Sequence, residues 1–236
     1  MQFSIPFYPI ILCIVLIVIV VMCVKEKKLT VPAAIVAGLV GTVIYLGAAE
    51  KGIFLLLTFF ILGVLATSHK KEVKAKVFNE EPEAPRTTGQ VLANGGAAAV
   101  LSLLAFLYPA HADMYKLMMA ASLASALADT LSSELGVVYG KRFFNILTFK
   151  RDTKGLDGVI SFEGTVIGAF GALVIALIYA GFSKLSLIVT LAGIIGNVID
   201  SILGATLEKK QLLNNNVVNF LNTSLAAITA LALMNI

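Results

Sequence analysis

Charged side chains are scarce in this 236-residue sequence. They make up 14% of it, hydrophobic residues make up 58%, and the mean hydropathy is +0.94. Because a soluble domain carries about 25% charged residues, a soluble globular domain is excluded. Apolar runs recur along the chain, each about 20 residues long and so able to cross the hydrocarbon core of a bilayer. We therefore expect an integral membrane protein, with no nucleic acid among its partners.

Cysteine and histidine are scarce as well. Cys13 and Cys23 both lie in the first apolar run, where we interpret them as small apolar side chains with no redox role. His69 and His111 fall in opposite connecting loops, so a Cys–His metal cluster is not expected. The first run has no basic segment before it and no small-residue cleavage site after it. We interpret it as a retained span and not as a signal peptide.

The chain is expected to form one domain, residues 1–236, built as an all-α polytopic bundle of about eight transmembrane helices. The apolar runs place the spans at about 5–24, 31–49, 52–67, 88–108, 114–136, 161–182, 184–206 and 217–235. Alternate loops contain 15 of the 18 Lys and Arg residues, and loops rich in these residues stay in the cytoplasm. We therefore expect a protein of the cytoplasmic membrane with both termini on the external side.

Polar residues are unevenly divided within this domain. Residues 1–67 contain few of them and are expected to be mainly structural, whereas residues 86–236 place them at the cytoplasmic ends of the last five spans. In the fourth span, Arg86, Gln90 and Asn94 follow one another at i, i+4 and i+8 and so share one face of the helix. They predict one wall of a polar site, although an interfacial anchor with a polar helix contact would give the same pattern.

Two carboxylates lie inside apolar spans, near their cytoplasmic ends. Asp129 ends the fifth span with Ser133 beside it, and Asp200 lies between Asn197 and Ser201 in the seventh. A carboxylate within an apolar span is costly unless it has a partner or faces a cavity. Close packing through glycines would explain the small residues of the seventh span but not its carboxylate. Both acids are therefore candidate site residues.

The remaining polar groups at this end suit a phosphate ligand. The sixth span begins near Gly158, Ser161 and Glu163, and a helix N-terminus offers free N–H groups and a positive dipole end. An acidic residue there can also serve only as a helix cap. Further candidates are the basic residues of the preceding loop and the asparagines that begin the eighth span: Lys141, Arg142, Lys154, Asn215 and Asn219.

Three expectations concern the borders of this cluster. Glu134 lies near the interface, where a solvated role and a site role are equally compatible with the sequence. Glu208 is placed at the surface, and residues 68–85 are expected to form a solvated connector that starts with a short helix over about 70–77.

Five motifs resemble, in the right order, the phytyl-phosphate kinase family of integral membrane proteins. They are R-T-T-G-Q-V-L-A-N-G-G, A-D-T-L-S-S-E-L-G, G-L-D-G-V-I-S-F-E-G-T, I-D-S-I-L-G-A-T-L-E and N-N-N-V-V-N-F, within residues 86–224. The chain is more distantly similar to CTP-dependent polyprenol kinases and phosphatidate cytidylyltransferases. The resemblance implies a Mg²⁺-dependent kinase that converts an isoprenyl monophosphate to the diphosphate with a CTP-type nucleoside triphosphate. Where the plant members have an Asn-Gly-Gly turn, this chain has Leu156-Asp157-Gly158.

The resemblance also implies roles for individual residues. Three acidic residues would bind Mg²⁺ and act in catalysis: Asp129, Glu163 and Asp200. The other candidates would contact phosphates or complete the nucleotide pocket: Arg86, Gln90, Asn94, Ser133, Lys141, Arg142, Lys154, Gly158, Ser161, Asn197, Ser201, Asn215 and Asn219.

Two other functions fit the same cluster. A cytidylyltransferase would form a CDP-lipid and release pyrophosphate, and a lipid or ion transporter would use Asp129 and Asp200 as ion sites. The one-sided placement of the polar groups favours chemistry on an amphiphile, because a conducting path places them at mid-depth or at both sides. The oligomeric state is left open, a homo-oligomer included.

Overall fold

The computed structural model describes residues 17–78 and 85–235, and most of these residues are helical. Residues 17–25 are helical and precede α2. The helices that follow are α2 (Val31–Ser68), α3 (Lys71–Phe78), α4 (Thr88–Leu107), η1 (Pro109–His111), α5 (Ala112–Tyr139), α6 (Phe162–Ala180), α7 (Lys184–Leu203), η2 (Gly204–Glu208) and α8 (Asn215–Met234). Among the described residues, five helices are long and apolar enough to cross a membrane, namely α2, α4, α6, α7 with η2, and α8.

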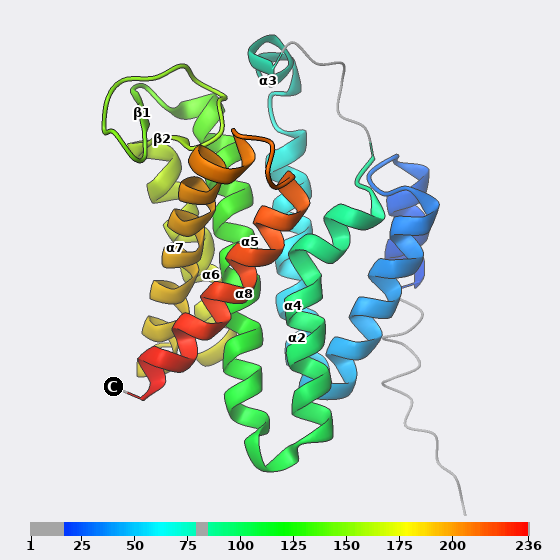
Figure 1. Cartoon of the computed structure of the whole chain (residues 1–236). Coiled ribbons are helices and arrows are strands. Elements are labelled where there is room, and N and C mark those ends of the chain that lie inside the picture. The colour runs from blue at the N-terminus through cyan, green and yellow to red at the C-terminus, as the bar shows by residue number, and fades with distance from the viewer. Residues whose placement is uncertain (1–16, 79–84, 236) are drawn as a thin grey trace, which may run out of the picture.

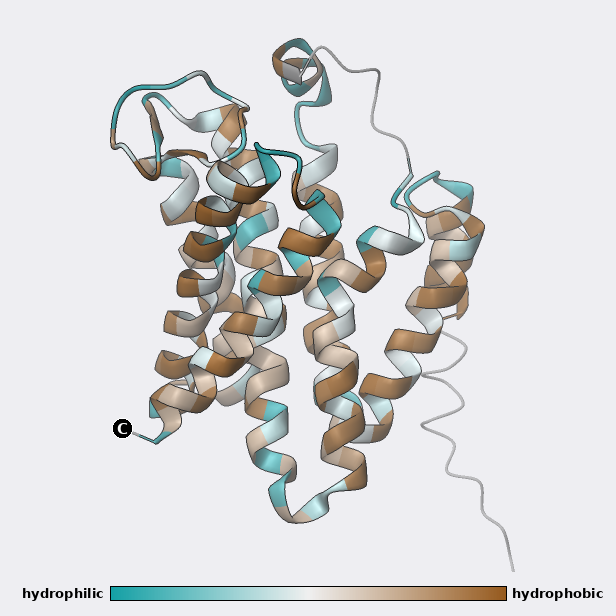
Figure 2. Cartoon of the chain, viewed as in Figure 1, coloured by the Kyte–Doolittle hydropathy of each residue, from teal (hydrophilic) through white to brown (hydrophobic). Residues whose placement is uncertain are grey.

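The connecting segments divide between two ends of the bundle. One end, here called the basic end, carries residues 26–30, α3, the segment between α5 and α6, and the segment between η2 and α8 (Figure 1). The kink of α2, the turn between α4 and α5, and the end of α8 lie at the other end. Figure 2 shows hydrophilic colour over the connections at the basic end and mostly hydrophobic colour along the outer helices. The described loops therefore alternate as the charge pattern predicts.

Helix α5 lies at the centre of the bundle. It packs against α2, α4, α6, α7 and α8, and every residue from 117 to 128 is buried. This explains why α5 is missing from the helices whose own hydropathy suits a span, since a helix surrounded by protein does not have to be apolar towards lipid. The expected span at 114–136 is thus a helix within the protein core.

The helix α2 contains two predicted spans in one continuous element. Its backbone leaves the helical region at Ala49, where φ is 50° and ψ is −147°. The two arms run in opposite directions on either side of this kink (Figure 1). The predicted boundary between the spans at 31–49 and 52–67 therefore coincides with a reversal of the chain.

Small residues bring α6 and α7 close to α5. A methyl group at Gly168 of α6 would come within 2.7 Å of the Ala128 carbonyl oxygen. One at Gly196 of α7 would come within 2.1 Å of the Ser125 hydroxyl oxygen. Without a hydrophobic force between helices in lipid, such close backbone contact is a main source of association. Close packing through a glycine, one interpretation of the small residues of the seventh span, is thus seen at Gly196, and Gly168 gives a second such contact.

The segment between α5 and α6 differs from the polar linker that the sequence suggested. Strand β1 (Phe143–Asn145) pairs with strand β2 (Val159–Ser161) in an antiparallel two-stranded ribbon at the basic end. Phe143 pairs with Ser161, the residue that begins α6. The short helix expected near 70–77 is confirmed as α3, whereas residues 5–16 of the first span and Cys13 lie outside the described residues.

We predict that Gly168→Ala destabilises the protein by roughly 1–3 kcal/mol, because the added methyl group overpacks the contact between α5 and α6. Thermal unfolding in detergent measures the effect. Gly41→Ala is the control, since a methyl group there meets its nearest neighbour, Leu56, at 3.7 Å. Equal unfolding temperatures for the two variants would contradict the packing argument.

Candidate functional site

A polar cavity of about 380 Å³ opens at the basic end of the bundle. It is lined by side chains of α2, α4, α5, α7, η2 and α8 and by the segment that contains β1 and β2. Most of the residues predicted from the sequence meet there: Arg86, Gln90, Asn94, Asp129, Ser133, Gly158, Ser161, Asn197, Asp200, Ser201, Asn215 and Asn219. Segments far apart in the sequence therefore contribute to one site.

Asp129 and Asp200, here called the carboxylate pair, face each other across the contact between α5 and α7. Both are half-buried in the cavity wall, and their carboxyl groups lie close enough to interact with each other. Among the described residues, neither forms an ion pair with Lys or Arg. Two carboxylates this close repel each other unless a proton or a cation lies between them. The pair is therefore suited to bind a cation.

Helix α8 holds Asp200 in place through a short chain of hydrogen bonds. Asn222 Nδ2 donates to Asp200 Oδ1 at 2.6 Å, and Ser125 Oγ of α5 donates to Asn222 Oδ1 at 2.9 Å. Asn222 and Ser125 are fully buried. Asn222 was not among the predicted site residues, and it orients a carboxylate of the pair without lining the cavity.

Three more acidic residues line the cavity, namely Glu134, Asp157 and Glu208. The prediction that Glu208 lies at the surface is wrong. It ends η2, a π-helical turn that continues α7, and it lines the cavity together with Asn215 at the start of α8. A π-helical turn is wider than an α-helical one and is frequent at functional sites. A regular helical pattern in the sequence does not reveal this wider π-helical turn.

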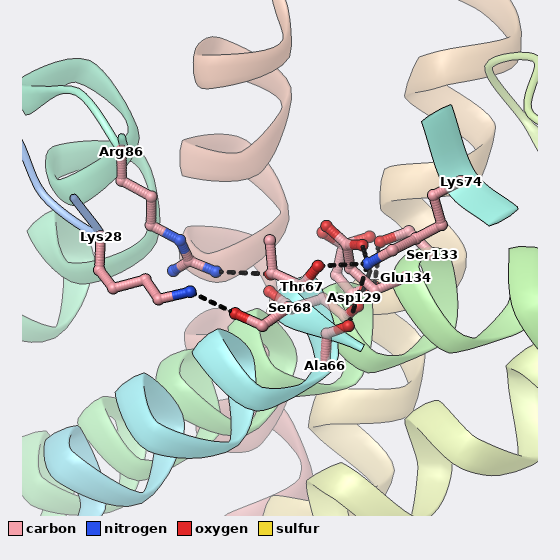
Figure 3. A network of polar contacts seen from close by, with 10 residues as sticks. Lys28, Ala66, Thr67, Ser68, Lys74, Arg86, Asp129, Ser133 and Glu134 are labelled. Carbon is pink, nitrogen blue, oxygen red and sulfur yellow. Dashed lines mark hydrogen bonds and ion pairs between the residues drawn. The ribbon is translucent and has the colours of Figure 1, made fainter. Parts of the chain in front are cut away.

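Lys74 of α3 lies beside the cavity and contacts Thr67 and Glu134, which line it, and its role was not predicted from the sequence. Its side chain donates to the Ala66 and Thr67 carbonyl oxygens at the end of α2 and pairs with Glu134 Oε2 at 2.5 Å (Figure 3). Lys74 is only 6% exposed. Its partners lie up to 60 residues away, so no local pattern marks this lysine as different from its neighbours.

Arg86 reaches the cavity from the start of α4. Its Nη2 donates to Thr67 Oγ1 at 3.3 Å (Figure 3), and a methyl group at Gly63 would lie 3.4 Å from that nitrogen. The backbone of Arg86 is fixed as well, because its N–H donates to the Lys28 carbonyl and its carbonyl accepts from Thr30. It is the one Lys or Arg among the described residues that line this cavity.

Three helices begin at the cavity, and each has a side-chain cap. Ser161 Oγ accepts from the Gly164 N–H at 3.1 Å at the start of α6, and Asn214 caps α8 in the same way. Thr87 and Gln90 form a reciprocal capping box at the start of α4. The cap interpretation thus accounts for the side chains of Ser161 and Gln90. The positive dipole ends of the three helices still point towards the cavity and favour an anion there.

Four predicted site residues do not line the cavity: Lys141, Arg142, Lys154 and Glu163. Glu163 lies in the first turn of α6 and accepts a hydrogen bond from the Lys141 backbone N–H at 3.3 Å. Arg142 is exposed, and the Lys154 ammonium lies 5.6 Å from the ring centroid of Phe143, which does line the cavity. These basic residues lie on or beside the ribbon near the cavity, so their contact with phosphates stays a prediction.

The metal site of three carboxylates expected from the sequence is not assembled in the structure. Within residues 17–78 and 85–235, no three His, Cys, Asp or Glu side chains are placed to bind one metal ion. Asp129 and Asp200 meet, but Glu163 does not join them. A divalent ion at this site would need further ligands from a substrate.

Comparison with known proteins agrees with this architecture. Residues 14–227 match the family described as integral membrane protein DUF92. The chain belongs to this family. The membership expected from the five motifs is confirmed, and the chain is an integral membrane protein.

The DUF92 relatives come from different kinds of organism. An uncharacterized membrane protein of Methanocaldococcus jannaschii, MJ0933, is 34% identical over 218 residues, covering 91% of this chain and 90% of the relative. Protein VTE6, chloroplastic, of Arabidopsis thaliana is 30% identical over 206 residues, which cover 83% of this chain and 62% of the plant protein. An uncharacterized membrane protein of Synechocystis, sll0875, is 31% identical and covers 84% of this chain and 79% of the relative. No solved structure matches the chain.

We predict that Lys74→Met destabilises this DUF92 protein, because Glu134 loses its cationic partner. The double variant Lys74→Met, Glu134→Gln is expected to recover part of the loss, with a coupling of about 0.5–3 kcal/mol, the range for residues in direct contact. Thermal unfolding of the wild type, both single variants and the double variant in one detergent gives the coupling. Additive losses would show that the two side chains act independently.

Proposed function

We propose that this protein is a Mg²⁺-dependent isoprenoid-phosphate kinase, which forms an isoprenyl diphosphate from the monophosphate at the cytoplasmic side of the membrane. CTP is the proposed phosphoryl donor. The observation that supports this function most strongly is the carboxylate pair, Asp129 and Asp200, which lies in a cavity where three helices begin. The resemblance of the five motifs to the phytyl-phosphate kinase family supports the same reaction.

The carboxylate pair fits a magnesium ion bound together with a substrate. Mg²⁺ is usually bound by one or two carboxylates plus phosphate oxygens and water, and seldom by a complete set of protein ligands. Asp129 and Asp200 provide two carboxylates, and Asn222 orients the second. When bound, the ion would neutralise phosphate charge and so reduce repulsion between donor and acceptor.

The cavity wall is rich in carboxylates, which repel phosphates, so a phosphate ligand needs positive groups nearby. The starts of α4, α6 and α8 supply positive dipole ends, and Arg86 supplies a guanidinium at the wall. Outside the cavity, Lys141 and Lys154 lie on or beside the ribbon, where we assign them to the nucleotide. This arrangement places cationic groups around an acidic centre, as transfer between two phosphate compounds requires.

The proposed reaction needs no protein nucleophile. An oxygen of the isoprenyl monophosphate attacks the γ-phosphorus of the nucleoside triphosphate, and the bond between that phosphorus and the bridging β,γ-oxygen breaks. The products are the isoprenyl diphosphate and the nucleoside diphosphate. The protein contributes position and charge, which are the main sources of catalysis in phosphoryl transfer.

We predict that Asp129→Asn and Asp200→Asn each lower the rate of diphosphate formation by about 100-fold or more, because each removes a charge that acts at the transferred phosphoryl group. Purified protein is incubated with CTP, ATP, GTP or UTP, Mg²⁺ and isoprenyl monophosphates of several lengths, and the lipid and nucleotide products are separated. Asp113→Asn is the matched control, since Asp113 lies on the same helix at the opposite end of the bundle and is exposed. Near-normal rates in both Asp129→Asn and Asp200→Asn would exclude the carboxylate pair from the reaction.

The same assay distinguishes the alternative functions. Nucleoside diphosphate is the expected by-product, whereas pyrophosphate and a CDP-lipid would identify a cytidylyltransferase. If no nucleotide is consumed with any acceptor, while substrate-dependent flux appears in liposomes without nucleotide, the protein is a transporter.

A further inference from the structure

A second cavity, of about 500 Å³, lies beside the polar one. Its walls come from the helix at residues 17–25, from both arms of α2 and from the first half of α4, and they are mainly apolar. Representative lining residues are Val20, Ile35, Gly38, Leu57 and Val91. The carboxylate pair lies outside this cavity, and the proposed phosphoryl transfer does not by itself require the apolar cavity.

The two cavities share one wall. Gln90 and Asn94 of α4, and Arg86 just before this helix, line both of them. The polar cavity with its carboxylates lies on one side of these residues and the apolar cavity on the other. The same three polar side chains therefore mark the border between a site for a charged head and a site for a hydrocarbon.

The apolar cavity also adjoins the outer surface of the bundle. Ile35 and Leu39 line it and are each 62% exposed on the outside of the protein, where the bilayer lies in an integral membrane protein. A hydrocarbon chain could therefore pass from the lipid into the cavity without crossing water. It would end next to Arg86, at the border with the polar cavity.

We propose that the apolar cavity binds the tail of the phosphorylated lipid whose head lies at the carboxylate pair. The cavity is then the site that selects chain length, because each methylene group that it buries adds to the affinity. The identity of the head as an isoprenyl monophosphate rests on the proposed function. The position of the tail rests on the two cavities and their shared wall.

Gly38 offers a direct test, because it lines the cavity and a Cβ atom added there meets no heavy atom within 4 Å. Gly38→Phe is expected to fill part of the cavity, whereas Gly38→Ala adds a methyl group and controls for the loss of glycine. Thr42→Phe is a second blocking variant on the same arm of α2 and starts from an exposed residue. Monodisperse elution and an unchanged unfolding temperature establish that each variant is folded.

The experiment measures binding without turnover. Wild type and variants are mixed, without nucleotide, with a phytyl-length monophosphate that carries a diazirine at the tail end, then illuminated and mapped by mass spectrometry. We expect adducts on residues 17–24, 31–42 and 56–60, loss of these adducts with excess unlabelled phytyl monophosphate, and at least tenfold lower labelling in Gly38→Phe and Thr42→Phe. Gly38→Ala should label like the wild type.

Two results would overturn the tail site. Adducts spread over the outer faces of α6 and α7 would place the tail elsewhere, and adducts at the cavity that phytyl monophosphate does not displace would show that it holds ordinary bilayer lipid. The kinase assay is scored separately. If the wild type forms no diphosphate but the labelling holds, the proposed reaction fails and the tail site stands. If diphosphate forms but the labelling maps elsewhere, the tail site alone fails.

Discussion

The structure depends on how two carboxylates are kept inside a helix bundle. A charged carboxylate in a low-dielectric region is costly unless a counter-charge, hydrogen bonds or a polar cavity accompanies it. Asp129 lies on the helix that the other helices surround, and Asp200 approaches it from α7, held by Asn222. The bundle meets the cost by opening a polar cavity at this point, lined by amides, hydroxyl groups and helix starts. Because no basic side chain among the described residues pairs with the two acids, a bound cation is the partner that this arrangement favours.

The alternating direction of the helices explains why opposite charges meet at one end. Helices α4, α6 and α8 begin at the basic end and turn their positive dipole ends to the cavity, whereas α5 and α7 approach it near their C-terminal ends and carry the carboxylates. The acidic side chains therefore line the same cavity as the starts of helices from other segments. The topology therefore suits the phosphate and metal of the proposed reaction, with few basic side chains inside the cavity.

Apolar runs were sufficient to place most of the long helices among the described residues. Asp129 and Asp200 could be named as candidates because an acid in an apolar run has few structural explanations. The polar residues of α4, α7 and α8 were found for a similar reason, as they share faces at helical spacing. Lys74 and Glu208 were missed or misplaced because their roles depend on tertiary contacts, one across 60 residues and one through a π-helical turn. Glu163 was grouped with the pair from its motif, but the first turn of α6 directs it to the Lys141 backbone.

The arms of α2 show how a region with little polarity can still serve the site. Its second arm supplies Thr67, whose hydroxyl accepts a hydrogen bond from Arg86, and Gly63, which leaves space for that guanidinium. Its first arm forms a wall of the apolar cavity, on the other side of the same arginine. A phosphorylated lipid has the same order of parts, with a charged head joined directly to a hydrocarbon. In the proposed complex, Arg86 would lie where the two parts of such a molecule join, and the apolar helices at the start of the chain would take part in substrate selection.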